Sequence, residues 1–355
     1  MKKLVSLIAV FALTLSFAGC MGNNTVTYNP EAPYWQDDTA AAMPATFSEI
    51  CNYSVDYAPL QEKGNEIVSV TLDKSESYYK TTVAHDVLGE QSCSVLTVET
   101  RMKGEYSVKS SEEGKTEPEA TFAFDDYSVS KTWFTWNGGI QVIKTVENSE
   151  STLPVNAIAS EDKNGNRFIK LACTITTEYG DTDALTKVEI TGDKEKSAPY
   201  FSLKDGYEGT FKKYKSTNYV DRNMLAFALR TFNFDKDMTY SFSTIDVLGN
   251  KKHTMKYSVS ATEPSEAIKN LKQNGTPLGT PYTDESGSGY VFSPATFEMK
   301  IAVNETYGGT PMVCKYVTGE KKDNFYYHYM YTMTTNIPYS LGTYTYTLTS
   351  IDRTK

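Results

Sequence analysis

Residues 344–349 read Tyr-Thr-Tyr-Thr-Leu-Thr, with a large apolar side chain at every second position. Similar alternation occurs at 255–260 and 297–303. Side chains of a strand point alternately to opposite faces, so a period of two gives one apolar face and one polar face. The pattern predicts antiparallel strands that bury one face and expose the other.

Turn signals containing glycine separate these runs, for example Leu88-Gly89, Asn164-Gly165 and Gly249-Asn250. The 26 tyrosines of the 355-residue chain, with abundant threonine, favour pleated, half-buried surfaces over helices. Short strands punctuated by such turns predict meanders of hairpins. The fold is therefore predicted to be mainly β, with a few short helices.

The chain also resembles itself. The tetrapeptide Asp-Val-Leu-Gly at 86–89 recurs at 246–249, an offset of 160 residues. The pair Gly138-Gly139 recurs as Gly308-Gly309, an offset of 170 residues and in the same order. Matches in one order favour a tandem duplication, and chance similarity among β-rich sequences is the alternative.

A third correspondence links the expected strand pairs at 169–190 and 326–348. We predict two tandem antiparallel β lobes, half-barrel or sandwich-like, at residues 60–204 and 205–355. Each lobe has an ordinary domain size. Whether the repeats share one sheet system or form two separate domains is left open.

Two helices are expected. Asp221 is a suitable N-cap for a helix with apolar residues at helical spacing from Met224 to Phe232, a stripe that packs on a sheet. Ser265 is a suitable cap for a shorter helix at 266–272, which Asn274-Gly275 would end.

A curved antiparallel sheet with an apolar helix on its concave face resembles the half-barrel lipoproteins of the outer-membrane lipoprotein carrier type. The stretches 219–229 (Tyr-Val-Asp-Arg-Asn-Met-Leu-Ala-Phe-Ala-Leu) and 340–346 (Ser-Leu-Gly-Thr-Tyr-Thr-Tyr) are similar to uncharacterised lipoproteins of Gram-positive bacteria. This likeness covers about the last 150 residues. It implies no established activity.

The first residues follow the export pattern of a cationic start, Met1 to Lys3, and an apolar run, Leu4 to Phe17. Roughly 14 apolar residues fall short of the ~20 needed to cross a bilayer, so residues 1–19 are predicted to be a cleaved signal peptide. Residues 17–20, Phe-Ala-Gly-Cys, resemble the bacterial lipobox, although Leu is usual in place of Phe17. The alternative is an ordinary signal peptide with a chance cysteine.

The lipobox resemblance implies that Cys20 carries a lipid and becomes the first mature residue. Acyl chains on one residue attach a protein firmly to a membrane. The expected location is the outer face of the bacterial cytoplasmic membrane, within the cell envelope. Residues 20–59 are polar and contain four prolines, which predicts a flexible tether.

Charge excludes some partners. Removal of Lys2 and Lys3 leaves 33 of the 35 basic residues against 44 acidic ones, a net charge of −11. An acidic chain is a poor partner for nucleic acid or anionic lipid surfaces, so no nucleic acid is expected.

The cysteines offer little chemistry. Cys51, Cys93, Cys173 and Cys314 contain no C-x-x-C pair, so no zinc or thioredoxin-like site is expected. Disulfides and buried free thiols both remain open for these four residues.

Motifs for catalysis are absent from the sequence. The three histidines, His85, His253 and His328, lack metal-ligand spacing, and no G-x-S-x-G or phosphate-binding loop occurs. A hydrolase that uses paired carboxylates, with Asp125, Asp126 or Glu178 available, is harder to exclude. We expect no enzyme, no metal and no cofactor.

Aromatic runs are the remaining candidates. Trp133 and Trp136 lie in Trp-Phe-Thr-Trp, and Tyr329 lies in the run at 325–331. Strand alternation places about half of each run in the core. The others, Trp133, Trp136 and Tyr329, are possible ligand contacts, since exposed aromatic rings stack on sugars or line lipid grooves.

Three functions compete. The first is a non-enzymatic, membrane-anchored binding protein whose concave apolar surface holds a hydrophobic or lipid-like ligand. The second is a glycan-binding or adhesin-like surface protein, for which Trp133, Trp136 and Tyr329 would form an open row. The third is an envelope hydrolase with two acidic side chains of raised pKa in one cleft. The sequence identifies neither the ligand nor the oligomeric state.

Overall fold

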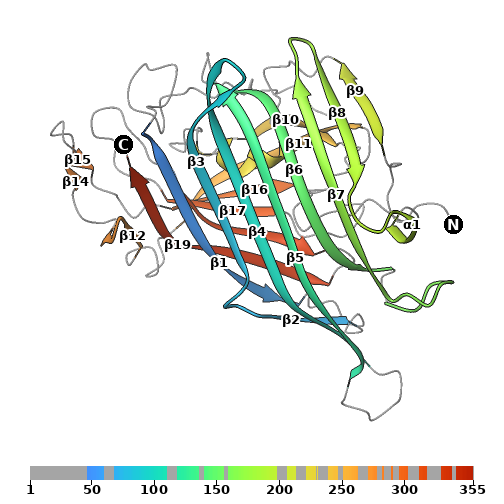
Figure 1. The fold of residues 1–355 in the computed structure, drawn as a ribbon. Helices are drawn as coiled ribbons and strands as arrows, with labels where there is room; N and C mark the ends of the chain where they lie inside the picture. Colours follow the sequence, from blue (N-terminus) through green and yellow to red (C-terminus); the bar gives the residue numbers. More distant parts are fainter. Residues whose placement is uncertain are drawn as a thin grey trace.

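The fold is given by a computed structural model. It describes residues 46–59, 68–109, 118–135, 140–155, 159–197, 206–212, 221–228, 230, 239–246, 251–262, 271–277, 282–283, 289–290, 296–302, 312–317, 329–337 and 341–354. The mainly β prediction is confirmed, because most described residues lie in strands (Figure 1).

The elements in chain order are β1 (Ser48–Ala58), β2 (Val68–Leu72), β3 (Tyr78–Leu88), β4 (Gln91–Lys109), β5 (Pro118–Thr135), β6 (Gln141–Pro154), β7 (Phe168–Tyr179), β8 (Asp183–Ile190), α1 (Lys194–Ser197), β9 (Tyr207–Lys212), the 3-10 turn η3 (Arg222–Met224), α2 (Leu225–Ala228), β10 (Thr239–Asp246), β11 (Lys251–Thr262), β12 (Lys272–Gln273), β13 (Thr276–Pro277), β14 (Tyr282–Thr283), β15 (Gly289–Tyr290), β16 (Thr296–Ala302), β17 (Met312–Val317), β18 (Tyr329–Ile337) and β19 (Gly342–Thr354).

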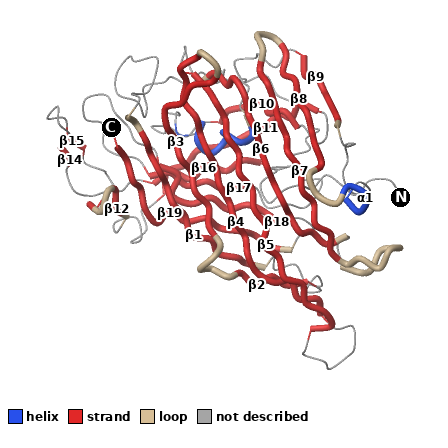
Figure 2. The backbone as a smooth tube through the Cα atoms, viewed as in Figure 1, coloured by secondary structure: helices blue, strands red, loops and turns tan. Residues whose placement is uncertain are grey.

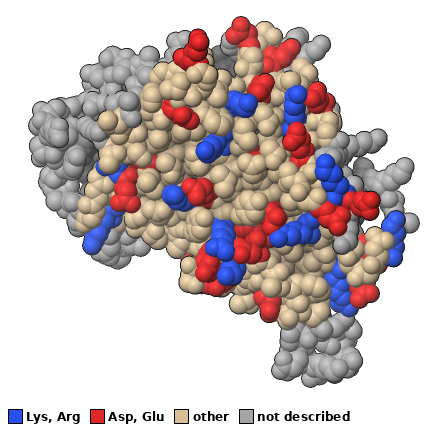
Figure 3. Space-filling view, viewed as in Figure 1, with Lys and Arg blue, Asp and Glu red and all other residues tan. Residues whose placement is uncertain are grey.

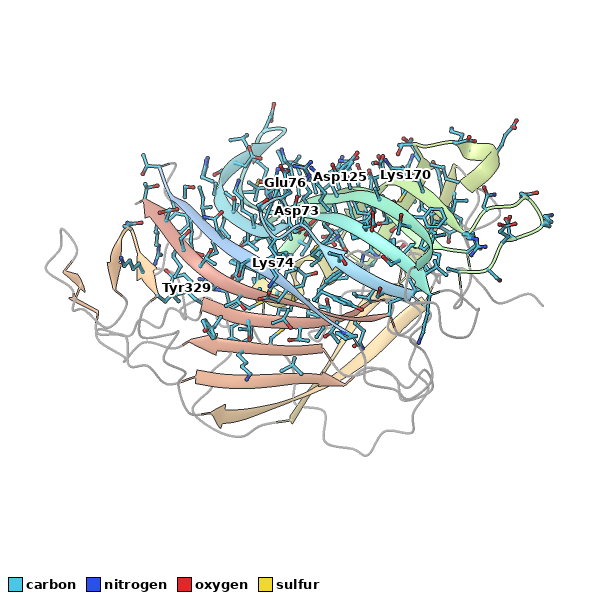
Figure 4. All side chains as sticks on the ribbon, turned by 90° about the horizontal axis from the view of Figure 1, so that it is seen from below. Asp73, Lys74, Glu76, Asp125, Lys170 and Tyr329 are labelled. Atoms are coloured by element: carbon cyan, nitrogen blue, oxygen red, sulfur yellow. The ribbon has the colours of Figure 1, made fainter. Side chains whose placement is uncertain are left out.

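The long strands form one antiparallel sheet. Neighbours pair in the order β10, β11, β16, β17, β18, β19, β1, β3, β4, β5, β6, β7, β8, β9. β2 pairs with the distal part of β4, and β12 touches β19 in a short parallel pairing. The sheet curves so that the layer containing β3–β8 lies over the layer containing β16–β18 (Figures 1 and 4). We call the side between the layers the inner face.

β1 connects the two layers, and it corrects the predicted tether. Its residues pair with β19 on one side, where Ser48 faces Thr354, and with β3 on the other, where Ser48 faces Ala84. Its buried residues Cys51, Tyr53 and Val55 alternate with less buried polar ones. The tether prediction is wrong for residues 48–58, because this alternation outweighs the neighbouring prolines.

The strands of both predicted repeats belong to this single sheet. The meander β3–β8 and the meander β10, β11, β16–β19 each contain six strands paired in chain order. Val98 pairs with Ser130 in the first, and Ser258 pairs with Lys300 in the second, which are the same two sequence offsets of 160 and 170. β9 pairs with β8, so the meander of the first repeat continues past the predicted boundary at residue 205. Common origin of the repeats stays a prediction.

The helix expected at Asp221 is present but short. The Asp221 carboxylate accepts a hydrogen bond from the Asn223 backbone N–H, as an N-cap does, and η3 and α2 follow directly. Met224, Leu225, Phe227 and Ala228 are buried. These residues and Arg230 form what we call the helical segment, 221–228 with 230, which lies between the two layers (Figure 2).

Several predictions fall on residues outside the described part of the chain: the signal peptide, Cys20, most of the tether and most of the helix predicted at 266–272. The end of that helix is wrong, because Lys272 lies in β12. Within the described ranges, no helix has both the length and the apolar character to cross a bilayer.

Candidate binding site on the inner face

A small cavity lies between the sheet and the helical segment. The sheet contributes Tyr53, Tyr79, Thr81, Leu96, Val98 and Met330, and the helical segment contributes Asn223, Ala226, Phe227 and Arg230. Its volume of about 20 Å³ has room for roughly one water molecule. The described part of the inner face is therefore closed by the helical segment.

Apolar packing holds the middle of the helical segment on the sheet. Met224 and Phe227 join a buried cluster with Val83, Leu96 and Phe134. The rings of Phe134 and Phe227 lie 5.7 Å apart, centroid to centroid. This apolar face drives the docking of a segment too short to be helical by itself.

Polar groups fix the start of the segment. Besides capping Asn223, the Asp221 carboxylate accepts hydrogen bonds from the Thr145 hydroxyl at 3.2 Å and from the Tyr179 hydroxyl. Burial raises the pKa of Asp221, although the Tyr179 hydrogen bond acts in the opposite direction. The carboxylate is enclosed and has donors for its oxygens, which is the role of a structural cap.

An ion pair lies beside this cap. Arg222 Nη2 is 2.5 Å from Glu147 Oε2, and the Asn223 side chain donates to the same oxygen at 3.2 Å. Both Arg222 and Glu147 side chains are buried, with 8% and 3% exposure. Removing one partner of a buried pair is costly, so this contact fixes where the segment sits.

A second buried pair fixes the other end of the segment. Arg230 donates to both carboxylate oxygens of Glu49 on β1, at 2.6 and 3.3 Å, and its guanidinium lies 4.9 Å from the Tyr329 ring centroid. Burial works to raise the pKa of Glu49, but Arg230 and Arg353 lower it overall. Glu49 is thus held as a carboxylate. The Tyr316 hydroxyl of β17 adds a hydrogen bond to the Ala226 carbonyl at 2.8 Å.

The inner face of β5–β8 carries a row of threonines. Thr132, Thr145, Thr177 and Thr186 face one another in register across the four strands. Their hydroxyls are paired at 3.2 Å between Thr132 and Thr145 and at 3.0 Å between Thr177 and Thr186. Thr145 links this row to the helical segment through Asp221. The inner face therefore has a hydroxyl-bearing part beside the aromatic part formed by Tyr53 and Tyr79.

Asp126 is a separate buried carboxyl. The β5–β6 pairing starts at Tyr127 opposite Glu150, and before that point the Asp126 carboxyl accepts the Thr152 backbone N–H at 2.9 Å. Asp126 is 2% exposed. Burial raises its pKa to about 7, against the lowering effect of the Thr152 hydrogen bonds. The carboxyl thus replaces a missing strand partner where β5 and β6 separate.

The predicted aromatic contacts do not form a row. Tyr329 is fully buried beside Arg230, so its prediction as an exposed ligand contact is wrong, because β18 turns this residue to the core. Trp133 is half-buried on the outer face of β5, where its indole N–H donates to Asp86 at 2.7 Å. Trp136 lies outside the described residues.

The titratable residues singled out by sequence are scattered. His85 contacts the Ser92 hydroxyl at 3.0 Å in the β3–β4 hairpin, and Asp125 and Glu178 are ion-paired on the outer face. The side chain of His253 and all of His328 lie outside the described part. Within that part no group of His, Cys, Asp and Glu is arranged to hold a metal ion.

The four cysteines are buried free thiols, which answers the question that the sequence left open. Burial raises the pKa of Cys51, Cys173 and Cys314 to about 12. At neutral pH such thiols stay protonated, and they are poor nucleophiles.

Comparison with known proteins adds no relative: no protein-family model, no curated protein and no solved structure matches the chain. The site is therefore interpreted from its own geometry. Sequence reasoning found Asp221 but missed Glu49, Glu147 and Arg230, whose pairings join residues 75 to 181 positions apart. Asp126 was named only as one of several available acids.

Proposed function

We propose that this protein is a membrane-anchored, extracytoplasmic lipoprotein that binds a hydrophobic or lipid-like ligand on its inner face and has no enzymatic activity. The observation that supports it is the apolar helical segment seated on the inner face, with a cavity beneath it. A curved sheet with such a surface can enclose an apolar molecule.

The size of the cavity sets a condition on this proposal. A space of about 20 Å³ is too small for an acyl chain, so ligand binding requires the helical segment to move. The ligand would then take over the contacts that Met224 and Phe227 make with Leu96 and Phe134. The neighbouring threonine row offers hydroxyls for a polar head group.

The two alternatives have less support. An open row for a glycan is not available at Trp133 and Tyr329, because Tyr329 is buried. For a hydrolase, Asp126 and Asp221 are the aspartates of raised pKa, but their partners Thr152 and Thr145 lie seven residues apart on β6, roughly 23 Å. Paired glycosidase carboxylates stand about 5 to 9.5 Å apart. Glu147 is nearer to Asp221, but it is buried against Arg222.

The lipid anchor remains part of the proposal through Cys20. Its support is the sequence Phe-Ala-Gly-Cys after an apolar run. A folded part that starts near residue 46 leaves about 25 residues between the anchor and the sheet. That length allows the inner face to reach molecules at the membrane surface.

Titration with a fluorescent long-chain fatty acid tests the ligand site. Phe227→Ala weakens packing of the helical segment and enlarges the cavity, so the dissociation constant should fall. Val98→Trp fills the cavity from the sheet side, so the dissociation constant should rise. Tyr127→Ala, on the outer face, is the matched control and should leave binding unchanged.

Equal affinity in all four proteins, or no saturable binding by any of them, would contradict the proposal. Circular dichroism of each variant confirms that the sheet is intact before titration.

A further inference from the structure

The outer face of the sheet carries two exposed tyrosines. Tyr78 on β3 is 39% exposed and Tyr127 on β5 is 44% exposed, while their neighbours Tyr79 and Asp126 are buried on the inner face. Among the described residues, the other large hydrophobic side chain this exposed is Val87, in the β3–β4 hairpin. Two aromatic rings kept in solvent on one face need a reason, since burial of each would be favourable.

The two tyrosines belong to one cross-strand row. Tyr78 pairs with Arg101 on β4, and Arg101 pairs with Tyr127 on β5. Adjacent strands are about 4.8 Å apart, so the two tyrosines stand roughly 10 Å apart with Arg101 between them. Glu150 on β6 continues the row, opposite Tyr127.

Ion pairs hold Arg101 in place between the rings. Its Nε and Nη2 donate to the two oxygens of Asp125, each at 2.8 Å, and its Nη1 donates to Glu76 at 2.8 Å. A guanidinium bonded in this bidentate way is planar and pre-organised. The bond to Arg101 also lowers the pKa of Asp125. The row therefore alternates aromatic rings with fixed planar polar groups.

The charges around the row balance. Lys103 lies 3.8 Å from Glu76, and Lys170 is ion-paired with Glu150. With Arg101 and Asp125 this makes three cations and three anions. Acidic and basic side chains are intermixed over this face (Figure 3), and Glu76, Asp125 and Lys170 lie together on the outer side of the sheet (Figure 4). Such a surface does not favour a polyanion or a polycation.

We propose that the outer face of β3–β6 is a binding platform for a linear, neutral, β-linked glycan, with Tyr78 and Tyr127 each stacking on a sugar ring. The ring spacing is close to the length of one disaccharide unit in an extended β-linked chain. The apolar face of a pyranose packs on a tyrosine ring, and its hydroxyls meet the carboxylates and the guanidinium at the rim. A neutral polymer suits the balanced charge.

This site lies on the opposite face from the helical segment, so it is independent of the proposed lipid-like ligand. It also differs from the glycan row expected from sequence, because it contains neither Trp133 nor Tyr329. A neutral glycan of the cell wall or of another cell would be the natural polymer of this chemistry for an exported protein.

The test is affinity electrophoresis and calorimetry of the full-length protein with cellohexaose and chitohexaose. The wild type should bind at least one of them. Tyr78→Ala and Tyr127→Ala should each weaken binding about tenfold, and the double variant should abolish it. Tyr78→Phe and Tyr127→Phe keep the stacking surface and should keep binding. Val87→Ala, an equally exposed change outside the row, is the control.

No binding of either hexasaccharide by the wild type would overturn the proposal. So would binding that Tyr78→Ala and Tyr127→Ala leave unchanged, or stronger binding of the polyanion polygalacturonate. Fatty-acid binding by the same variants reports on the inner face separately, so failure here leaves the lipid-like ligand untouched.

Discussion

Asp126→Asn should remove a pH dependence from the stability of the protein. Asp126 is buried where β5 leaves β6, and its pKa is raised from 3.8 to about 7. Between these values the folded state keeps a proton that the unfolded state has lost. The contribution of this group is therefore full below about pH 4 and is lost as the pH rises towards 7.

The size of the effect follows from proton linkage. Each pH unit in this interval costs about 1.4 kcal/mol of unfolding free energy for one proton. From pH 5 to the pKa near 7 the wild type should therefore lose about 3 kcal/mol through Asp126. Asparagine does not titrate, and its carbonyl still accepts the Thr152 N–H. Relative to the wild type, Asp126→Asn should gain about 3 kcal/mol between pH 5 and pH 8.

Urea unfolding at pH 5, 6, 7 and 8 measures this difference, and Asp125→Asn is the matched control. Asp125 is the adjacent residue on the outer face, and Arg101 lowers its pKa below 3.8. Its stabilising contribution is already complete at pH 5, so the control should differ from the wild type by a constant amount. Parallel pH profiles for the wild type and Asp126→Asn would refute the reasoning.

Three further predictions follow from other contacts. Arg230→Met should cost about 3 to 5 kcal/mol in urea unfolding, because Glu49 stays buried without its main partner, and Glu49→Gln in the same chain should recover part of this loss; a cost under 1 kcal/mol would contradict a buried pair. Cys51, Cys173 and Cys314 should react with iodoacetamide at pH 8 only after unfolding, as read by mass spectrometry, and rapid labelling of the native protein would argue against their burial. Cys20→Ser should release the protein from membranes or leave its signal uncleaved, and unchanged membrane retention and mass would count against the lipid anchor.

Sequence periodicity was enough to predict the strands, because each strand here has one buried and one solvated face. The runs at 255–260 and 344–349 lie in β11 and β19. The same rule, applied to Cys51, Tyr53 and Val55, identifies β1, yet the nearby prolines suggested a tether. The local signal was present and was given too little weight.

The pairing of strands and the site were beyond reach from sequence. Nothing local in β1 says that it lies between β19 and β3, since that order depends on contacts nearly 300 residues apart. The burial of Tyr329 depends on the phase of β18, which a run of seven residues rich in aromatics does not reveal. Glu49 and Arg230 looked like ordinary surface charges until the helical segment brought them together.

Native mass spectrometry of the protein purified from its own membrane tests the central proposal most directly. We expect a population heavier than the lipidated polypeptide by a constant increment, which dissociates as a hydrophobic molecule and is more abundant in Phe227→Ala than in Val98→Trp. A single mass equal to the lipidated chain in all three proteins would contradict a lipid-like ligand on the inner face.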